Sequence, residues 1–209
     1  MSKQRKVDGR KCEWVAENLK MLQESHIAPL IKYVDDLRAS FPLRQIPYFD
    51  TRYGGVRGRV LLLKEAPGPT AIASGFVAPE NKGQTAKNLR ILREDAPLAR
   101  GYVVNWNIVP WYIGNTDGTK IAPPTRVQVA EGISCLPALL RLLPDLRVVI
   151  LMGTKAKKGW KAACLAGCEH LEILETWHPS PVALNRNPDY RPHILDTLIR
   201  ANKLAMAEW

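Results

Sequence analysis

The sequence contains no long apolar run and little cysteine. None of its hydrophobic stretches approaches the roughly 20 residues that a membrane-spanning helix needs. The polar, basic N-terminus does not have the pattern of a secretory signal. Only four cysteines occur, and they are scattered: Cys12, Cys135, Cys164 and Cys168. Because no export signal is seen, we expect a cytoplasmic protein with free thiols and no contact with a membrane.

The charge of the chain is strongly unbalanced toward basic residues. Thirty Lys and Arg stand against 20 Asp and Glu, which gives a formal net charge of +10. This excess favours a polyanionic partner, with nucleic acid ahead of an anionic membrane surface. A basic soluble protein without such a partner is about equally compatible with the charge alone. At 209 residues the chain suits one domain, which we place at 12–209 after a basic tail over 1–11.

Apolar segments alternate with helical patterns along the chain. The segments expected to form strands are Val60–Leu63, one that starts at Tyr102, Arg147–Met152 and Leu171–Thr176. The helical patterns cover Glu13–Gln23, Ile27–Phe41, Thr85–Arg93, Thr125–Leu143 (kinked or broken at Pro137), Thr154–Ala166 and His193–Ala207. The strand segments are apolar throughout, as in strands buried on both faces. The order predicts an α/β fold, a three-layer α/β/α sandwich around a four-stranded parallel sheet.

A rigid turn follows the first predicted strand. Residues 64–69 read Lys-Glu-Ala-Pro-Gly-Pro, and the two prolines and the glycine exclude a strand or helix interior there. Open α/β sheets bind their ligands at the carboxyl ends of central strands. We therefore expect Glu65 to lie at a ligand site.

Two motifs carry a resemblance to a known family. Glu-Ala-Pro-Gly at 65–68 is followed by Gly75-Phe76-Val77 and by Gly83-Gln84. His-Pro-Ser-Pro at 178–181 comes directly after another apolar strand, about 110 residues further on. Together they resemble the first and second motifs of the uracil-DNA glycosylase superfamily, closest to its family 4/5-like branch. The resemblance implies the same sandwich fold, DNA as the partner and excision of a base.

The resemblance assigns catalytic roles to Glu65 and His178. Glu65 is the only carboxylate of the first motif and is expected to position or deprotonate the attacking water. His178 is expected to donate a hydrogen bond to O2 of the departing base. A structural histidine at a strand end is the alternative for His178.

Further residues are expected to hold the flipped base. Phe76 matches the aromatic residue that stacks on it, although an ordinary core Phe is a serious alternative. Asn107 matches the residue that reads the base edge, with Asn105 as the register alternative and a turn Asn as the other interpretation. An amide meets the donor and acceptor of a uracil edge and mismatches cytosine. Ala66 completes the base-binding set.

The DNA backbone is expected to contact both motif loops. The resemblance assigns this role to Pro67, Gly68, Gln84, Ser180 and Pro181. Residues 182–184 follow where the family inserts a wedge into the duplex, and Leu184 is our choice for the wedge.

This sequence departs from the family pattern in three ways. Ala66 stands where the best-studied branch has a catalytic Asp, and Lys64 replaces the usual leading Gly. A cation at 64 would either change which base is accepted or pair with Glu65. The Glu-type branch commonly holds a four-Cys iron–sulfur cluster, but apart from Cys135 the ligand positions are not matched, so we expect no cofactor and no metal.

The resulting hypothesis is a monomeric DNA glycosylase that excises uracil or another deaminated base with water, acts at the nucleoid or in the nucleus, and releases the free base. Two alternatives stay open. The first is a binding module that keeps the fold but has lost catalysis, which the altered first motif suggests. The second is an unrelated hydrolase of free nucleotides on a similar sandwich.

Overall fold

The computed structural model describes residues 9–115, 122–163 and 165–207. Most of the predicted tail, together with Cys164 and the side chain of Cys12, lies outside the described part. The first helix, α1 (Gly9–Lys20), begins four residues before the expected start at Glu13. The last three residues of the segment predicted as a tail are therefore helical.

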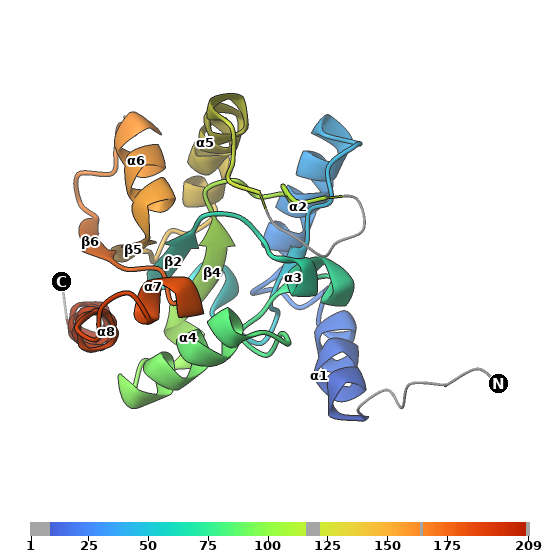
Figure 1. The fold of residues 1–209 in the computed structure, drawn as a ribbon. Helices are drawn as coiled ribbons and strands as arrows, with labels where there is room; N and C mark the ends of the chain where they lie inside the picture. The colour runs from blue at the N-terminus through green and yellow to red at the C-terminus, as the bar shows by residue number, and fades with distance from the viewer. Residues whose placement is uncertain (1–8, 116–121, 164, 208–209) are drawn as a thin grey trace.

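The centre of the molecule is a parallel sheet of four strands. They are β2 (Val60–Lys64), β4 (Val103–Asn107), β5 (Val148–Met152) and β6 (Glu172–Thr176), in the spatial order β4-β2-β5-β6 (Figure 1). The predicted sheet is thus confirmed. Lys64 is the register partner of Asn107, so the last residues of β2 and β4 lie side by side.

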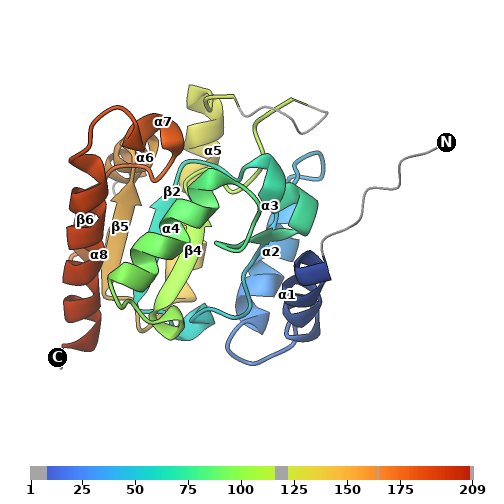
Figure 2. The same ribbon diagram turned by 60° about the horizontal axis from the view of Figure 1, so that its bottom comes forward.

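Helices cover both faces of this sheet, as the apolar strands require. On one face, Leu61 and Leu63 pack in a core with α2 (Ala28–Ser40), α5 (Arg126–Arg141) and α6 (Thr154–Ala163). On the other, Val60 and Leu62 pack with α4 (Gln84–Asp95) and α8 (Tyr190–Met206) (Figure 2). Within the described ranges, none of the helices combines the length and the apolar character that crossing a bilayer demands.

Several short elements were not expected from the sequence. A pair of two-residue parallel strands, β1 (Tyr48–Phe49) and β3 (Phe76–Val77), lies outside the main sheet. Helix α3 (Pro69–Ser74) begins at Pro69, although residues 64–69 were predicted to form a turn. A proline in the first turn needs no backbone N–H, which explains the difference. The remaining elements are α7 (Pro181–Leu184) and the 3₁₀ turns Gly55–Arg57 and Arg100–Tyr102.

Two helices also differ in extent from the prediction. Helix α5 continues through Pro137, and α8 begins at Tyr190 instead of His193. Thr125 caps α5 with a reciprocal pair of hydrogen bonds to Gln128, which defines the start of that helix firmly.

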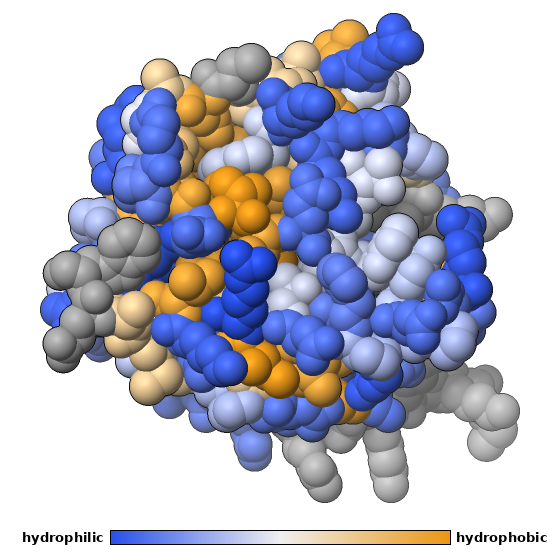
Figure 3. All heavy atoms as spheres, turned by 90° about the vertical axis from the view of Figure 1, so that its left-hand side faces the viewer, coloured by the Kyte–Doolittle hydropathy of each residue, from blue (hydrophilic) through white to orange (hydrophobic). Residues whose placement is uncertain are grey.

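The edge strand β6 is shielded by charged side chains. Figure 3 shows the face over α6, β6 and α8, where apolar atoms lie between charged groups. Ile173 of β6 is 36% exposed there. On either side of it, Lys157 approaches Glu175 to 3.3 Å and Arg200 approaches Glu172 to 3.9 Å. Charges at a sheet edge oppose pairing with another strand.

Candidate active site

A cavity of about 450 Å³ lies at the carboxyl ends of β2 and β4. Its walls come from the first motif with the start of α3, the segment around the start of α4, the end of β4 and the second motif. The lining residues include Lys64, Glu65, Ala66, Pro67, Gly68, Thr70, Val77, Asn81, Gln84, Thr85, Leu89, Asn107, His178 and Ser180. The fold therefore brings most of the sequence-predicted site residues to one cavity.

The first motif is held by an extension of β4. The backbone N–H of Ile108 donates to the Lys64 carbonyl at 2.7 Å, and that of Val109 donates to the Glu65 carbonyl at 3.0 Å. These bonds continue the parallel pairing of β2 and β4 for two residues beyond the strands. The turn is rigid for that reason as well as for its prolines.

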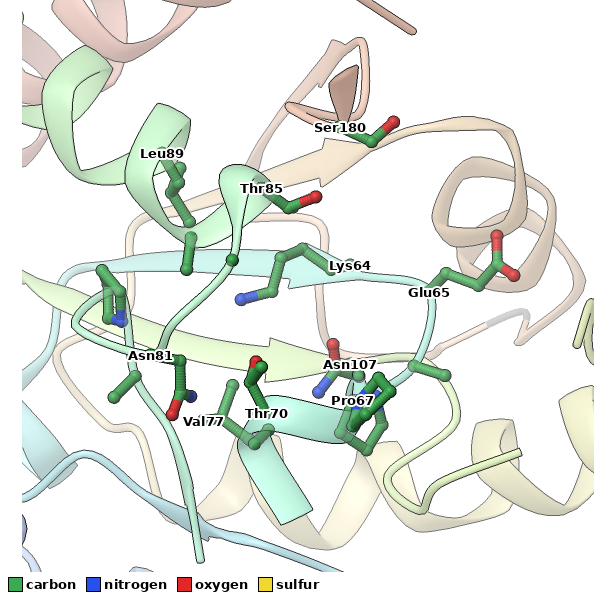
Figure 4. A pocket seen from close by; sticks show the side chains of 18 of the residues that line it. Lys64, Glu65, Pro67, Thr70, Val77, Asn81, Thr85, Leu89, Asn107 and Ser180 are labelled. Atoms are coloured by element: carbon green, nitrogen blue, oxygen red, sulfur yellow. The ribbon is translucent and has the colours of Figure 1, made fainter. Parts of the chain in front are cut away.

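The side chains of Lys64 and Glu65 diverge. Lys64 extends along the cavity on the side of Asn107, whereas Glu65 points the opposite way (Figure 4). No ion pair joins the two among the described contacts. Burial raises the pKa of Glu65, and the positive charge of Lys155 on α6 partly offsets this rise. Burial alone lowers the pKa of Lys64 to about 8.

Asn107 presents an unused donor to the cavity. Its side chain is 1% exposed, and its amide Nδ2 finds no hydrogen-bond acceptor in the described part of the protein. A buried donor without a partner is costly and calls for an explanation, which at a cavity wall includes a hydrogen bond to a ligand. Asn105 is buried elsewhere, beside Leu30 and Phe49 and away from this cavity. Of the two register alternatives, the structure places Asn107 at the cavity.

Contacts with α4 fix the second-motif loop. The Asn88 side-chain amide of α4 donates to the Pro179 carbonyl at 2.9 Å, and Gln84 Nε2 donates to Asn88 Oδ1 at 2.8 Å. Gln84 is itself at the cavity wall. Gln84, one of the residues predicted to contact the DNA backbone, is thereby linked through Asn88 to the loop that carries His178.

His178 is positioned by a glycine with a left-handed backbone. The Gly153 N–H donates to the Thr176 carbonyl at 3.0 Å, and Gly153 has φ +92°. A Cβ at Gly153 would lie 3.0 Å from Cβ of His178. The close approach of β5 to the loop therefore depends on the missing side chain.

The imidazole of His178 is uncharged at neutral pH. Burial, and then the charge of Lys64, lower its pKa to about 4. A neutral imidazole has one N–H donor and one acceptor nitrogen. It is thus able to donate a hydrogen bond to a leaving group without carrying a net charge itself.

Beyond His178, α7 presents one apolar side chain to solvent. The Ser180 hydroxyl accepts the Ala183 N–H at 3.3 Å and caps this short helix. Pro181 begins it and does not line the cavity. Leu184, our predicted wedge, is half-buried against the core beside α8, whereas Val182 is 76% exposed. Val182 therefore fits a wedge better than Leu184 does.

Phe76 lies behind the cavity wall. It is 2% exposed, its ring centre is 6.2 Å from that of Tyr48, and Val77 takes the place at the cavity. The Asn81 amide donates to the Phe76 carbonyl at 2.8 Å and ties this segment together. Stacking of Phe76 on a base stays a prediction, and it requires the ring to move.

Sequence reasoning missed part of the lining. Asn81, Thr85 and Leu89 carry no motif, and only their place between the first motif and the predicted helix at Thr85 gave any signal. The inward direction of Lys64 was also not evident, because a strand pattern that is apolar on both faces does not tell which way its last residue points.

The two described free thiols, Cys135 and Cys168, lie in different environments. Cys135 is buried in α5 and donates to the Glu131 carbonyl at 3.3 Å, and burial raises its pKa. Cys168 is half-buried. The described ranges hold no group of three His, Cys, Asp or Glu able to share a metal ion. The predicted absence of a cluster stays a prediction.

Comparisons with known proteins agree with this arrangement. The model of the Uracil DNA glycosylase superfamily matches residues 51–199, a span that includes both motifs. Among solved structures, wild-type SMUG2 of Pedobacter heparinus matches with a TM-score of 0.55 and 14% sequence identity, over 86% of this chain and 85% of that chain. This likeness shows a shared fold. The search of curated proteins gave no significant match.

Proposed function

The chain belongs to the uracil DNA glycosylase superfamily, and on this premise we propose that it hydrolyses the N-glycosidic bond of uracil or another deaminated base in DNA. Water is the nucleophile, and an abasic site and the free base are the products. The observation that carries the proposal is the unpartnered Asn107 amide, which faces a cavity shared with His178 and Glu65.

Base recognition falls to the end of β4. A base stacked inside a duplex cannot enter a protein cavity, so the target nucleotide has to leave the duplex. The Asn107 amide then donates to a carbonyl on the base edge, which ends its unpaired state. Ala66 and Pro67 form the apolar wall beside it. The amide carbonyl accepts from a ring N–H, so a keto base fits better than an amino base.

Bond cleavage uses Glu65 of the first motif and His178 of the second motif, which both line the cavity. Neutral His178 donates to O2 of the departing base, where negative charge develops in the transition state. Glu65 orients the water that attacks the sugar, and its ionised form stabilises positive charge on the sugar ring. Lys155 favours that ionised form against the effect of burial. Ala66 contributes no carboxylate, so Glu65 has this role alone.

DNA contact spreads outward from the cavity. Gly68, Gln84 and Ser180 lie at its rim and supply backbone and side-chain donors for phosphates. Val182 projects from α7 at a position suited to fill the gap left by the flipped base. Since phosphate contacts release counterions, each one steepens the fall of log affinity with log salt by about 0.9. A DNA affinity that does not change with salt would argue against phosphate contacts by these residues.

One observation favours a second candidate, a module that binds DNA or a base without cleaving it. The family's small residue at position 64 is replaced by a lysine whose side chain extends into the cavity. That side chain takes up space beside Asn107 and lies close enough to His178 to lower its pKa. If this second candidate is right, the protein binds DNA or a base but does not cleave the N-glycosidic bond.

Single-turnover cleavage of labelled oligonucleotides decides between the two. Each oligonucleotide carries one uracil, hypoxanthine or xanthine and is treated with alkali after the reaction. Glu65→Gln and His178→Ala should each abolish or strongly reduce cleavage. His170→Ala is the matched control, because His170 is exposed and outside the cavity. Cleavage that persists in the Glu65 and His178 variants would refute these roles, and tight binding without cleavage would favour the binding module.

A further inference from the structure

Lys64 is a cavity-lining amine without an anionic partner. It ends β2 beside Asn107 and extends into the cavity (Figure 4). Glu65, the only carboxylate among the described lining residues, points away from it. No described residue forms an ion pair or a hydrogen bond with the Lys64 side chain.

The surroundings of Lys64 make its amine reactive. Burial disfavours the ammonium form and lowers its pKa to about 8. At pH 8 roughly half of such lysines are uncharged, against well under 1% of lysines with the ordinary pKa. Uncharged, desolvated lysines are the ones that form Schiff bases with carbonyl compounds. The charge of Lys64 is one of the causes that lower the pKa of His178, and both side chains line the same cavity.

We propose that Lys64 is a nucleophile toward the abasic deoxyribose and gives the protein a strand-cleaving lyase activity. The inference extends the proposed function, because an abasic site is the product of base excision and its ring-opened form has an aldehyde at C1′. The substrate class is therefore an aldehydic abasic site in DNA.

The step is a condensation followed by an elimination. The lone pair of Lys64 Nζ attacks C1′, the C–N bond forms, and the carbonyl oxygen leaves as water to give an iminium ion. A proton then leaves C2′, and the C3′–O bond breaks with loss of the 3′ phosphate group and formation of a C2′=C3′ double bond. Water takes the C2′ proton, because the Glu65 carboxylate points away from Lys64. Water finally hydrolyses the imine and releases Lys64 and an unsaturated aldehyde.

Borohydride trapping on preformed abasic DNA tests the inference. The full-length protein is incubated with a labelled duplex whose abasic site was made chemically, and sodium borohydride then reduces the imine to a stable secondary amine. We expect a covalent protein–DNA complex and, without borohydride, a nicked strand. A duplex with a tetrahydrofuran site, which has no aldehyde, should give neither.

Two variants and one mapping experiment identify the amine. Lys64→Arg keeps the charge but does not form the imine, and it should reduce trapping to background. Lys203→Gln, on α8 and away from the cavity, is the matched lysine control and should trap normally. Digestion and mass spectrometry of the wild-type adduct should place it on Lys64. This mapping stands even if the arginine variant fails to fold.

The outcomes separate this inference from the proposed function. No trapping by wild-type protein, or an adduct on another amine, overturns the lyase activity. Because the abasic site is supplied ready-made, failure to excise any base does not affect the test. Conversely, base excision without trapping leaves the glycosylase proposal intact and removes Lys64 as a nucleophile.

Discussion

The contact between Gly153 and His178 allows a quantitative test of how the second motif is positioned. Gly153→Ala introduces two separate costs. At φ +92° an alanine is strained, by roughly 1–2 kcal/mol. Its Cβ also falls 3.0 Å from Cβ of His178, which is tight enough that the loop has to give way by a few tenths of an ångström.

Gly167→Ala is the matched control for the strain alone. Gly167 has φ +77°, and a Cβ there meets nothing within 4 Å. Gly167→Ala should lose roughly 1–2 kcal/mol of unfolding free energy, about 2–8 °C in Tm for a chain of this size, and Gly153→Ala should lose at least as much because of its additional contact. Only Gly153→Ala should also slow catalysis. A misplacement of 1 Å can cost about 100-fold, so a few tenths of an ångström should cost roughly three- to tenfold.

Thermal unfolding and single-turnover cleavage on the same preparations measure the two effects. The rates are compared well below the lower Tm, so that partial unfolding does not enter. Equal cleavage rates for the two alanine variants would show that the loop absorbs the new methyl group elsewhere and that Gly153 does not position His178. A loss confined to Gly153→Ala would support the positioning role.

Three further measurements examine other parts of the site. Asn107→Asp should reduce discrimination for uracil over cytosine by about tenfold or more, because an unmet buried hydrogen bond costs about 1–3 kcal/mol; unchanged discrimination would remove Asn107 from base reading. Val182→Ala should slow cleavage in duplex but not in single-stranded DNA, whereas Leu184→Ala should mainly lower the unfolding free energy, by about 1–2 kcal/mol. The reverse pattern would restore Leu184 as the wedge. His178 has a pKa of about 4 when folded against its ordinary 6.5, so the unfolded chain binds more protons between these values and stability should rise with pH across that window. Thermal unfolding of wild type and His178→Gln should show a smaller rise in the variant, and equal slopes would contradict the assignment.

The sheet and the cavity could be predicted from sequence because both depend on local rules. Val60–Leu63 is apolar at every position, and a strand covered by helices on both faces requires that pattern. The carboxyl ends of parallel strands then share one edge. The strand-end rule pointed to Glu65, and the family resemblance added Asn107 and His178; in the structure all three line one cavity.

The parts that escaped prediction depend on packing across the fold. Phe76 matched the motif position of a stacking aromatic, but the pairing of β3 with β1 directs its ring toward Tyr48 and leaves Val77 at the cavity. The pattern of residues near 76 contains nothing about β1, which lies about 27 positions earlier. In a short apolar segment either face can be buried, and the element that it packs against determines which one is.

The direction of the Lys64 side chain could likewise not be predicted from the local sequence. From sequence, a lysine next to Glu65 was compatible with an ion pair to Glu65 and with a change in which base is accepted. In the structure Glu65, the first residue after β2, points away from Lys64 and feels the charge of Lys155, while Lys64 extends into the cavity. An amine without a carboxylate keeps the full effect of burial on its pKa, whereas a paired one would not. Under the proposed lyase reaction, Lys64 changes what the site does to its product, and borohydride trapping on abasic DNA tests this role directly.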